Sequence, residues 1–161
     1  MKKLTIVLMA LVGITNLSFA HSVKYEGLSM PESVAEGPDG YIYVSEIGKR
    51  DKDLDGKISK IDKKGNITPF ATGLYDPKGI VFYKEKLYVT DRDVIIEVNI
   101  DGTWTVFGST MAFPKTPVFL NDIDVDSDGN FYITDTSNFE TGGIVFKMNL
   151  AGDITVLFDE T

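Results

Sequence analysis

The sequence predicts an all-β protein built from a repeated four-stranded unit, and three observations support this fold class. Short segments of alternating apolar and polar residues follow one another after residue 20, and none of them shows sustained helical periodicity. The order aromatic, β-branched, hydroxyl, acid occurs three times, with its tyrosines Tyr43, Tyr88 and Tyr132 spaced 45 and 44 residues apart. Gly next to Asp or Asn separates many of the segments, as tight hairpin turns require.

Each unit contains four expected strands, called A to D in chain order. They are residues 32–36, 41–46, 57–62 and 66–71, then 78–83, 87–91, 94–100 and 103–107, then 121–126, 131–135, 143–150 and 153–158. Four short strands repeated about every 45 residues are typical of a β-propeller blade. A β-sandwich would explain the strands but not the fixed period. We therefore predict three propeller blades, over residues 30–74, 75–119 and 120–161.

Composition excludes several classes of function. The 161 residues include 24 Asp and Glu against 16 Lys and Arg, with one His and no Cys, for a net charge of −8. The absence of Cys excludes disulfides, iron–sulfur clusters and a thiol nucleophile, and one His excludes metal sites that need several. The acidic balance argues against nucleic acid as a partner, because phosphate neutralisation needs clustered cationic residues.

The N-terminal segment has the features of an export signal. Lys2 and Lys3 precede a mostly apolar stretch over residues 4–17, and small residues occupy the −3 and −1 positions of a cleavage site after Ala20. A membrane anchor is the alternative, but the stretch is shorter than the ~20 apolar residues that a spanning helix needs. We expect a periplasmic or secreted bacterial protein, with residues 1–20 removed and no membrane association afterwards. Residues 21–29 are expected to form an N-terminal segment that could supply a ring-closing strand.

Three blades are fewer than a closed propeller contains, since these folds close with about 4–8. Either the chain is the first part of a longer protein, or copies of it associate into a ring. Truncation is the simpler of the two explanations.

The strand order places two sets of polar residues at one end of the blades, because strand A of a four-stranded meander begins where strand B ends. The first set begins the A strands: Glu32, Lys78 and Asn121. The second set ends the B strands: Glu46, Asp91 and Asp135. The A-strand residues are expected nearest to the central axis, and the oxygens of Glu32 and Asn121 suit a hard divalent cation and its ligand.

The acids that end the B strands have two interpretations. They could bind a ligand at the axis, or they could accept hydrogen bonds from backbone groups of the next loop. The second interpretation is favoured for all three, and Asp135 is also kept as a candidate substrate-binding residue.

A second candidate metal site follows the second strand of the first unit. Residues 51–62 match the 12-residue calcium-loop pattern, with Gly56 at the position of the sharp bend. The candidate ligands are Asp51, Asp53, Asp55, Lys57 through its carbonyl oxygen, Ser59 and Asp62. The flanking segments are expected strands, so this is not an EF-hand. Calcium binding is favoured over a solvated acidic turn.

Two segments carry a family resemblance: Pro31-Glu32-Ser33, and residues 120–135 from Leu120-Asn121-Asp122 to Thr134-Asp135. They resemble the senescence-marker-protein/gluconolactonase/luciferin-regenerating-enzyme-like family, and the repeats also resemble NHL-type blades. The resemblance covers all three blades and implies the N-terminal half of a six-bladed propeller. It implies that Glu32 binds a central cation and that Asn121 lies in the substrate pocket. The remaining ligands, including the general base, would follow Thr161.

The resemblance implies a divalent cation, calcium in the first instance, and a lactone or other sugar-derived small molecule as ligand. A metal-dependent lactonase is expected only if the missing blades are supplied. The alternative is a non-catalytic, calcium-stabilised NHL-like propeller that binds a carbohydrate or protein partner. A half-gene product without a stable function is the third interpretation.

Overall fold

The computed structural model describes residues 24–49, 52–140 and 142–160. These residues form three four-stranded antiparallel sheets, each a meander in chain order. The strands of the first blade are β1 (Pro31–Glu36), β2 (Ile42–Glu46), β3 (Gly56–Ile61) and β4 (Ile67–Leu74). Those of the second blade are β5 (Pro77–Tyr83), β6 (Lys86–Asp91), β7 (Val94–Val98) and β8 (Trp104–Gly108). Those of the third blade are β9 (Leu120–Val125), β10 (Phe131–Asp135), β11 (Ile144–Met148) and β12 (Ile154–Asp159).

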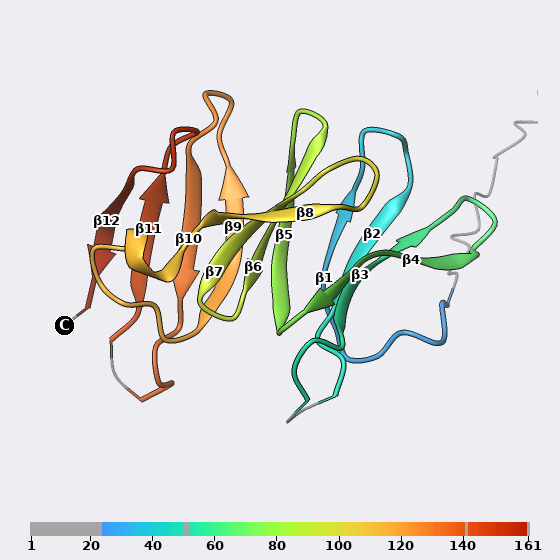
Figure 1. Ribbon diagram of the computed structural model, residues 1–161, viewed down its shortest axis with the longest axis horizontal. Helices are drawn as coiled ribbons and strands as arrows, with labels where there is room; N and C mark the ends of the chain where they lie inside the picture. Colours follow the sequence, from blue (N-terminus) through green and yellow to red (C-terminus); the bar gives the residue numbers. More distant parts are fainter. Residues whose placement is uncertain (1–23, 50–51, 141, 161) are drawn as a thin grey trace, which may run out of the picture.

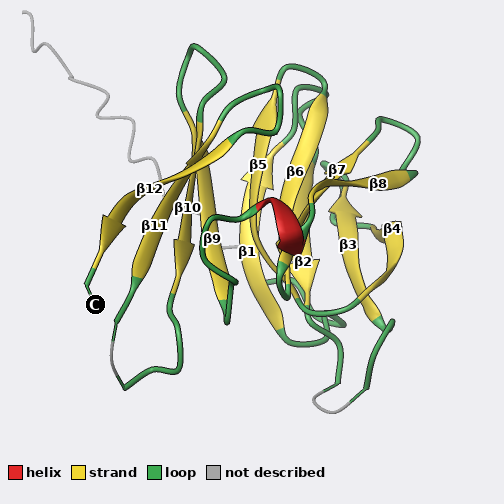
Figure 2. Cartoon of the chain, turned by 60° about the vertical axis from the view of Figure 1, so that its left-hand side comes forward, coloured by secondary structure: helices red, strands yellow, loops and turns green. Residues whose placement is uncertain are grey.

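The predicted fold class is confirmed, and all twelve expected strands are present. Their bounds differ from the expectation by at most three residues. The described residues also form a short 3-10 helix, η1 (Thr110–Ala112), between the second and third blades. Figure 2 shows this helix in red. No helix among the described residues is long and apolar enough to cross a membrane.

The three blades are arranged side by side, and the first strand of each blade lies next to the first strand of its neighbour. β5 contacts both β1 and β9, and Figure 1 shows the second blade between the other two. This arrangement brings the starts of β1, β5 and β9 to one end of the molecule. The expected export signal lies outside the described residues. Of the expected N-terminal segment, residues 24–29 are described and form no strand.

The blades pack through apolar faces that the alternation of each strand produces. Tyr43 of the first blade is fully buried, with its ring 4.9 Å from that of Phe70 and 4.9 Å from that of Phe82. The equivalent Tyr88 packs at 4.4 Å from Phe131 of the third blade. Two of the recurring tyrosines, Tyr43 and Tyr88, therefore belong to the apolar clusters through which one blade contacts the next.

One glycine sets how closely two inner strands approach. A Cβ on Gly79 of β5 would lie 2.6 Å from the Cα of Asp122 and 2.7 Å from the backbone nitrogen of Ile123, both in β9. Real Cβ atoms do not occupy such positions, so only glycine permits this spacing. Gly79 follows Lys78, and this close approach therefore lies next to the candidate site.

Candidate functional site

The sheet register brings the predicted polar residues to one end of the blades. Each strand A begins opposite the end of its strand B, through the pairs Pro31 with Glu46, Pro77 with Asp91, and Leu120 with Asp135. Glu32 and Lys78 each lie one residue beyond these starting residues, as does Asn121. The structure thus places both predicted sets at the same end, as the meander topology requires.

The acids that end the B strands accept hydrogen bonds from backbone groups. Asp91 accepts from the N–H groups of Tyr75 at 3.0 Å and Asp76 at 2.6 Å. Asp135 accepts from Val118 at 2.7 Å and Phe119 at 3.0 Å, and also from the N–H of Ser137 at 2.7 Å. Both carboxylates thereby hold the segment that leads into strand A of their own blade.

Glu46 has the same function in the first blade. Its Oε2 accepts from the Ser29 N–H at 2.5 Å, and its Oε1 accepts from the hydroxyl of Ser59. The Nζ of Lys57 lies 3.4 Å from Oε2 of the same carboxylate. All three acids hold the loop that precedes strand A of their blade. Asp135 also contacts the expected next loop, after strand B, through the N–H of Ser137.

Asp135 as a substrate ligand remains a prediction, and the structure limits it. The side chain is buried, with 3% of the residue exposed, and both oxygens already accept backbone hydrogen bonds. A ligand would have to compete with three N–H donors of the protein.

Glu32, near the start of β1, is exposed to solvent, as is Asp122 in β9. Partial burial raises the pKa of Glu32, the nearby Asp122 carboxylate raises it further, and the ammonium of Lys78 opposes both effects. Two acidic groups from β1 and β9 therefore influence each other electrostatically across the inner strands. Asp122 is not among the predicted site residues, because a single acid within a strand forms no sequence pattern that indicates a binding site.

Lys78 is buried between the second and third blades, with 4% of the residue exposed. Its Nζ donates to the carbonyl oxygen of Asp76 at 3.1 Å and lies 4.2 Å from the ring centre of Phe119. Burial lowers the pKa of Lys78, while the charges of Asp76, Asp91 and Glu32 oppose that shift. The ring of Phe119 supplies part of the stabilisation that water would otherwise give to the ammonium group.

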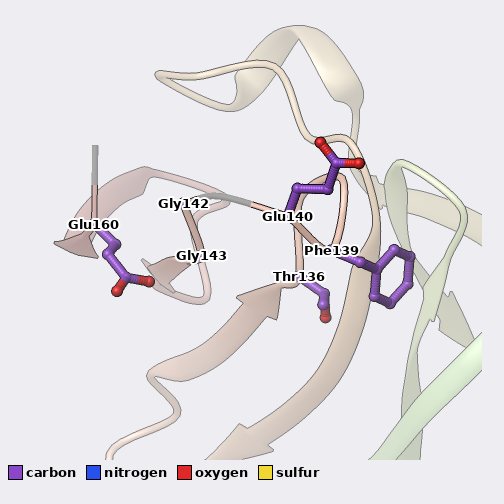
Figure 3. Close-up of a pocket in the computed structure, with 6 residues that line it drawn as sticks. All are labelled: Thr136, Phe139, Glu140, Gly142, Gly143 and Glu160. Atoms are coloured by element: carbon purple, nitrogen blue, oxygen red, sulfur yellow. The ribbon is translucent and has the colours of Figure 1, made fainter.

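Asn121 is half-buried and oriented by one neighbour. Its Nδ2 donates to Oγ1 of Thr136 at 2.9 Å, which directs the amide oxygen away from that hydroxyl. Thr136 also lines an open hollow of about 550 Å³ next to this site, together with Phe139, Glu140, Gly142, Gly143 and Glu160. Figure 3 shows that the carboxylates of Glu140 and Glu160 do not point toward each other. The hollow has room for a small molecule, but its acids do not converge on one ion.

The chemistry of the donors fits a hard cation only in part. Glu32 offers a carboxylate and Asn121 an amide oxygen, which are ligand types that calcium and magnesium accept. In the part of the chain that the structure describes, no group of three or more acidic, His or Cys side chains is close enough to hold a metal ion. The described residues therefore form part of a cation site at most, with the charge of Lys78 nearby.

The structure does not bring the described residues of the predicted calcium loop together. Lys57 and Ser59 lie in β3, a central strand of its sheet, and Asp62 follows the end of that strand. A strand rises about 3.3 Å per residue, so the six residues of β3 separate Asp62 from Asp55 by roughly 20 Å. Asp62 instead accepts from the N–H groups of Lys64 at 2.8 Å and Asn66 at 2.9 Å in the next turn.

The first residues of the loop pattern have individual partners. Asp53 forms an ion pair with Arg92 of the second blade, in which its Oδ1 lies 2.5 Å from Nη2 of the guanidinium group. Asp55 accepts from the Lys49 N–H at 3.2 Å, while its Oδ1 is buried without a hydrogen-bond partner in the described structure. Asp51 lies outside the described residues. A cation site formed by Asp51, Asp53 and Asp55 remains a prediction, without the contribution of Asp62.

Comparison with solved structures confirms the predicted resemblance at the level of the fold. The chain is similar to a luciferin-regenerating enzyme, with a TM-score of 0.64 and 10% sequence identity over 80% of this chain and 45% of the other. It is similar to a gluconolactonase from Xanthomonas campestris, with a TM-score of 0.60 and 19% identity over 83% of this chain and 48% of the other. It is also similar to the calcium-binding protein regucalcin from Agrobacterium tumefaciens, with a TM-score of 0.60 and 16% identity over 80% and 44% of the two chains.

No protein-family model matches the sequence, and no curated protein matches it either. The chain spans slightly less than half of the length of the solved structures with which it aligns. The class that the fold defines is therefore the β-propeller, of which three blades are described.

Proposed function

We propose that this chain contributes Glu32 and Asn121 to the central site of a metal-dependent lactone hydrolase. The observation that carries the proposal is the position of Asn121, whose amide is fixed by Thr136, a residue that also lines the open hollow between the β10–β11 loop and Glu160. The fold is similar to that of a gluconolactonase and of a calcium-binding protein, which supports both the substrate class and the cation.

In this proposal the two residues have different tasks. Glu32 is the cation ligand, and the amide of Asn121 holds a polar group of the lactone. Hydrolysis requires polarisation of the lactone carbonyl and a water molecule as nucleophile, and a bound divalent cation supplies the polarisation. Asp135 would contribute by fixing the loop that leads into β9, and hence the position of Asn121.

The proposal includes calcium at a second place and export from the cell. The buried, unpartnered Oδ1 of Asp55 and the exposed Asp53 support a calcium ion in the connection between β2 and β3. The basic and apolar pattern of residues 1–20 supports export to the periplasm or exterior.

The test is calcium-dependent hydrolysis of an aldonolactone, followed by pH-stat, together with calcium titration calorimetry. We expect turnover above the spontaneous rate, and a loss of at least tenfold in kcat/KM for Glu32→Gln, which removes the charge that binds the cation. The control is Glu36→Gln, at the other end of the same strand. For Asp55→Asn we expect one calcium equivalent fewer and unchanged turnover. No hydrolysis above background, or equal rates for the two glutamate variants, would contradict the lactonase proposal.

One observation favours the alternative of a non-catalytic binding propeller. Lys78 places a buried positive charge at this end of the blades, where it partly offsets the burial and the Asp122 charge that raise the pKa of Glu32. Calcium binding with no lactone turnover in the same experiment would favour this alternative.

A further inference from the structure

We propose that a hollow between the second and third blades, at the end of the molecule opposite the candidate central site, binds a neutral sugar ring. The hollow has a volume of about 660 Å³ and lies among the β5–β6 turn, the β11–β12 turn and the outer strand β8. Each A strand starts at the candidate site, so its turn into strand B lies at the other end. The proposal rests on a comparison of the two blade–blade interfaces inside the chain, and it does not depend on the proposed activity.

The interface between the first and second blades is closed at the position where the next interface is open. The β7–β8 turn of the second blade packs directly on β4, since a Cβ on Gly102 would lie 2.1 Å from the carbonyl oxygen of Phe70. Phe107 is the bulged residue of β8, as Phe70 is of β4. A Cβ on Gly152, in the equivalent β11–β12 turn, would lie 3.8 Å from the carbonyl oxygen of Phe107. The turn of the third blade therefore lies farther from its neighbour, which leaves room for the hollow.

The lysine that covers an aromatic ring at the first interface is replaced by an acid at the second. Lys60 of β3 places its Nζ 5.9 Å from the ring centre of Phe70. The equivalent residue of the second blade is Glu97 of β7, because each lies opposite the recurring tyrosine of its sheet. A carboxylate cannot make this cation–π contact, so Phe107 keeps a half-buried ring on the wall of the hollow.

The charged groups around the hollow balance one another. They are the ammonium groups of Lys84 and Lys86 and the carboxylates of Glu85 and Glu97. Glu97 accepts hydrogen bonds from the Nζ of Lys86 and from the hydroxyl of Tyr88, the latter at 2.9 Å. An anion or a cation in the hollow would therefore meet as many like charges as opposite ones. A neutral hydroxyl group is both donor and acceptor, so it can pair with the ammonium and the carboxylate groups alike.

The walls of the hollow supply apolar surface and a hydroxyl group that is free to bind a ligand. Phe107 and Leu150 form the apolar surface, and Leu150 is 45% exposed. The ring of Tyr83 packs at 6.2 Å from that of Phe131, and its hydroxyl makes no hydrogen bond to any residue that the structure describes. A sugar ring matches these walls, because its C–H face is apolar and its edge carries hydroxyl groups. The C–H face would lie on Phe107 and Leu150, with a hydroxyl group bonded to that of Tyr83.

The first test is a titration of the isotope-labelled chain with D-glucose, D-galactose and D-mannose, followed by two-dimensional NMR. We expect at least one of these sugars to cause saturable shifts of the backbone amides of residues 84–86 and 150–152, without shifts at Asn121 or Thr136. Glucuronate and glucosamine carry a charge on a similar ring and should bind no more tightly than the best neutral sugar. Shifts at Asn121 and Thr136 alone would assign the sugar to the candidate central site and overturn this proposal.

The second test uses two variants of the walls, each with a matched control. Phe107→Ala should weaken binding at least tenfold, whereas Phe70→Ala removes the equivalent ring from the closed interface and should leave the affinity unchanged. Tyr83→Phe should weaken binding about fivefold through the loss of one hydrogen bond, and its control is Tyr41→Phe in the first blade. Circular dichroism establishes that each variant is folded. No saturable shift with any neutral sugar, tighter binding of a charged sugar, or equal affinities of Tyr83→Phe and its control would each overturn the proposal.

Discussion

At the scale of single residues, the turns opposite the candidate site depend on carboxylates that cap backbone groups. Asp62 and Asp126 begin two turns of the same sequence form, Asp-x-x-Gly-Asn, and each accepts from the backbone N–H and the side-chain amide of its asparagine. Asp126 also accepts from the hydroxyl of Tyr132 at 3.0 Å. Such side-chain bonds fix the turn that joins two strands.

The pKa of Asp126 makes this capping testable. Hydrogen bonds from Asn130 and Tyr132 lower the pKa of Asp126 from 3.8 to about 2. A pKa that is lower in the folded than in the unfolded chain stabilises the fold above pH 3.8, and this stabilisation is lost as the pH falls toward 2. Asp126→Asn should therefore lower the Tm at pH 7, while the Tm values of variant and wild type converge near pH 2.

Thermal unfolding followed by circular dichroism between pH 2 and pH 7 measures this convergence. Asp128→Asn removes the same charge from the same turn and serves as the control. A Tm difference for Asp126→Asn that does not change with pH would show that the charge of the carboxylate is not what stabilises the turn.

Asp135 provides a second residue-scale prediction. Its removal in Asp135→Ala would leave the N–H groups of Val118, Phe119 and Ser137 without their acceptor. Unsatisfied buried donors cost about 1–3 kcal/mol each, so we expect the free energy of unfolding to fall by at least about 2 kcal/mol. Urea denaturation measures the change, with the exposed Asp124→Ala as control. A variant as stable as the wild type would favour the ligand-binding interpretation of Asp135.

At the scale of elements, the spacing of β5 and β9 is the feature most sensitive to substitution. Gly79→Ala would place a methyl group 2.6 Å from the backbone of Asp122, so the two strands would have to separate. Overpacking of this kind typically costs about 1–3 kcal/mol. We expect a lower Tm for Gly79→Ala and little change for Gly143→Ala, whose Cβ would meet only the Asp135 carbonyl oxygen at 3.6 Å. Equal effects of the two substitutions would contradict this account.

At the scale of the whole molecule, each blade is stabilised mainly by its neighbours. The apolar cores lie between blades rather than within them, one around Tyr43 and Ile96 and the other around Tyr88 and Phe131. The described residues supply only part of the candidate central site.

The sequence by itself determined the strands, their order and the repeat, because each depends on local alternation and on turn residues that act within a few positions. The same patterns identified Glu32, Lys78 and Asn121 at one end of the inner strands, since a meander fixes which strand ends meet.

Only the tertiary structure decided which groups those side chains contact. The acid pattern at residues 51–62 overlaps the strand expected over residues 57–62, and in the structure β3 carries Asp62 away from Asp55. Asp122 lies near enough to influence Glu32 because β9 packs against β5, which in turn packs against β1. Thr136 contacts Asn121 because the β10–β11 loop begins beside the start of β9. The first of these interactions joins different blades, and the second joins different strands of one blade.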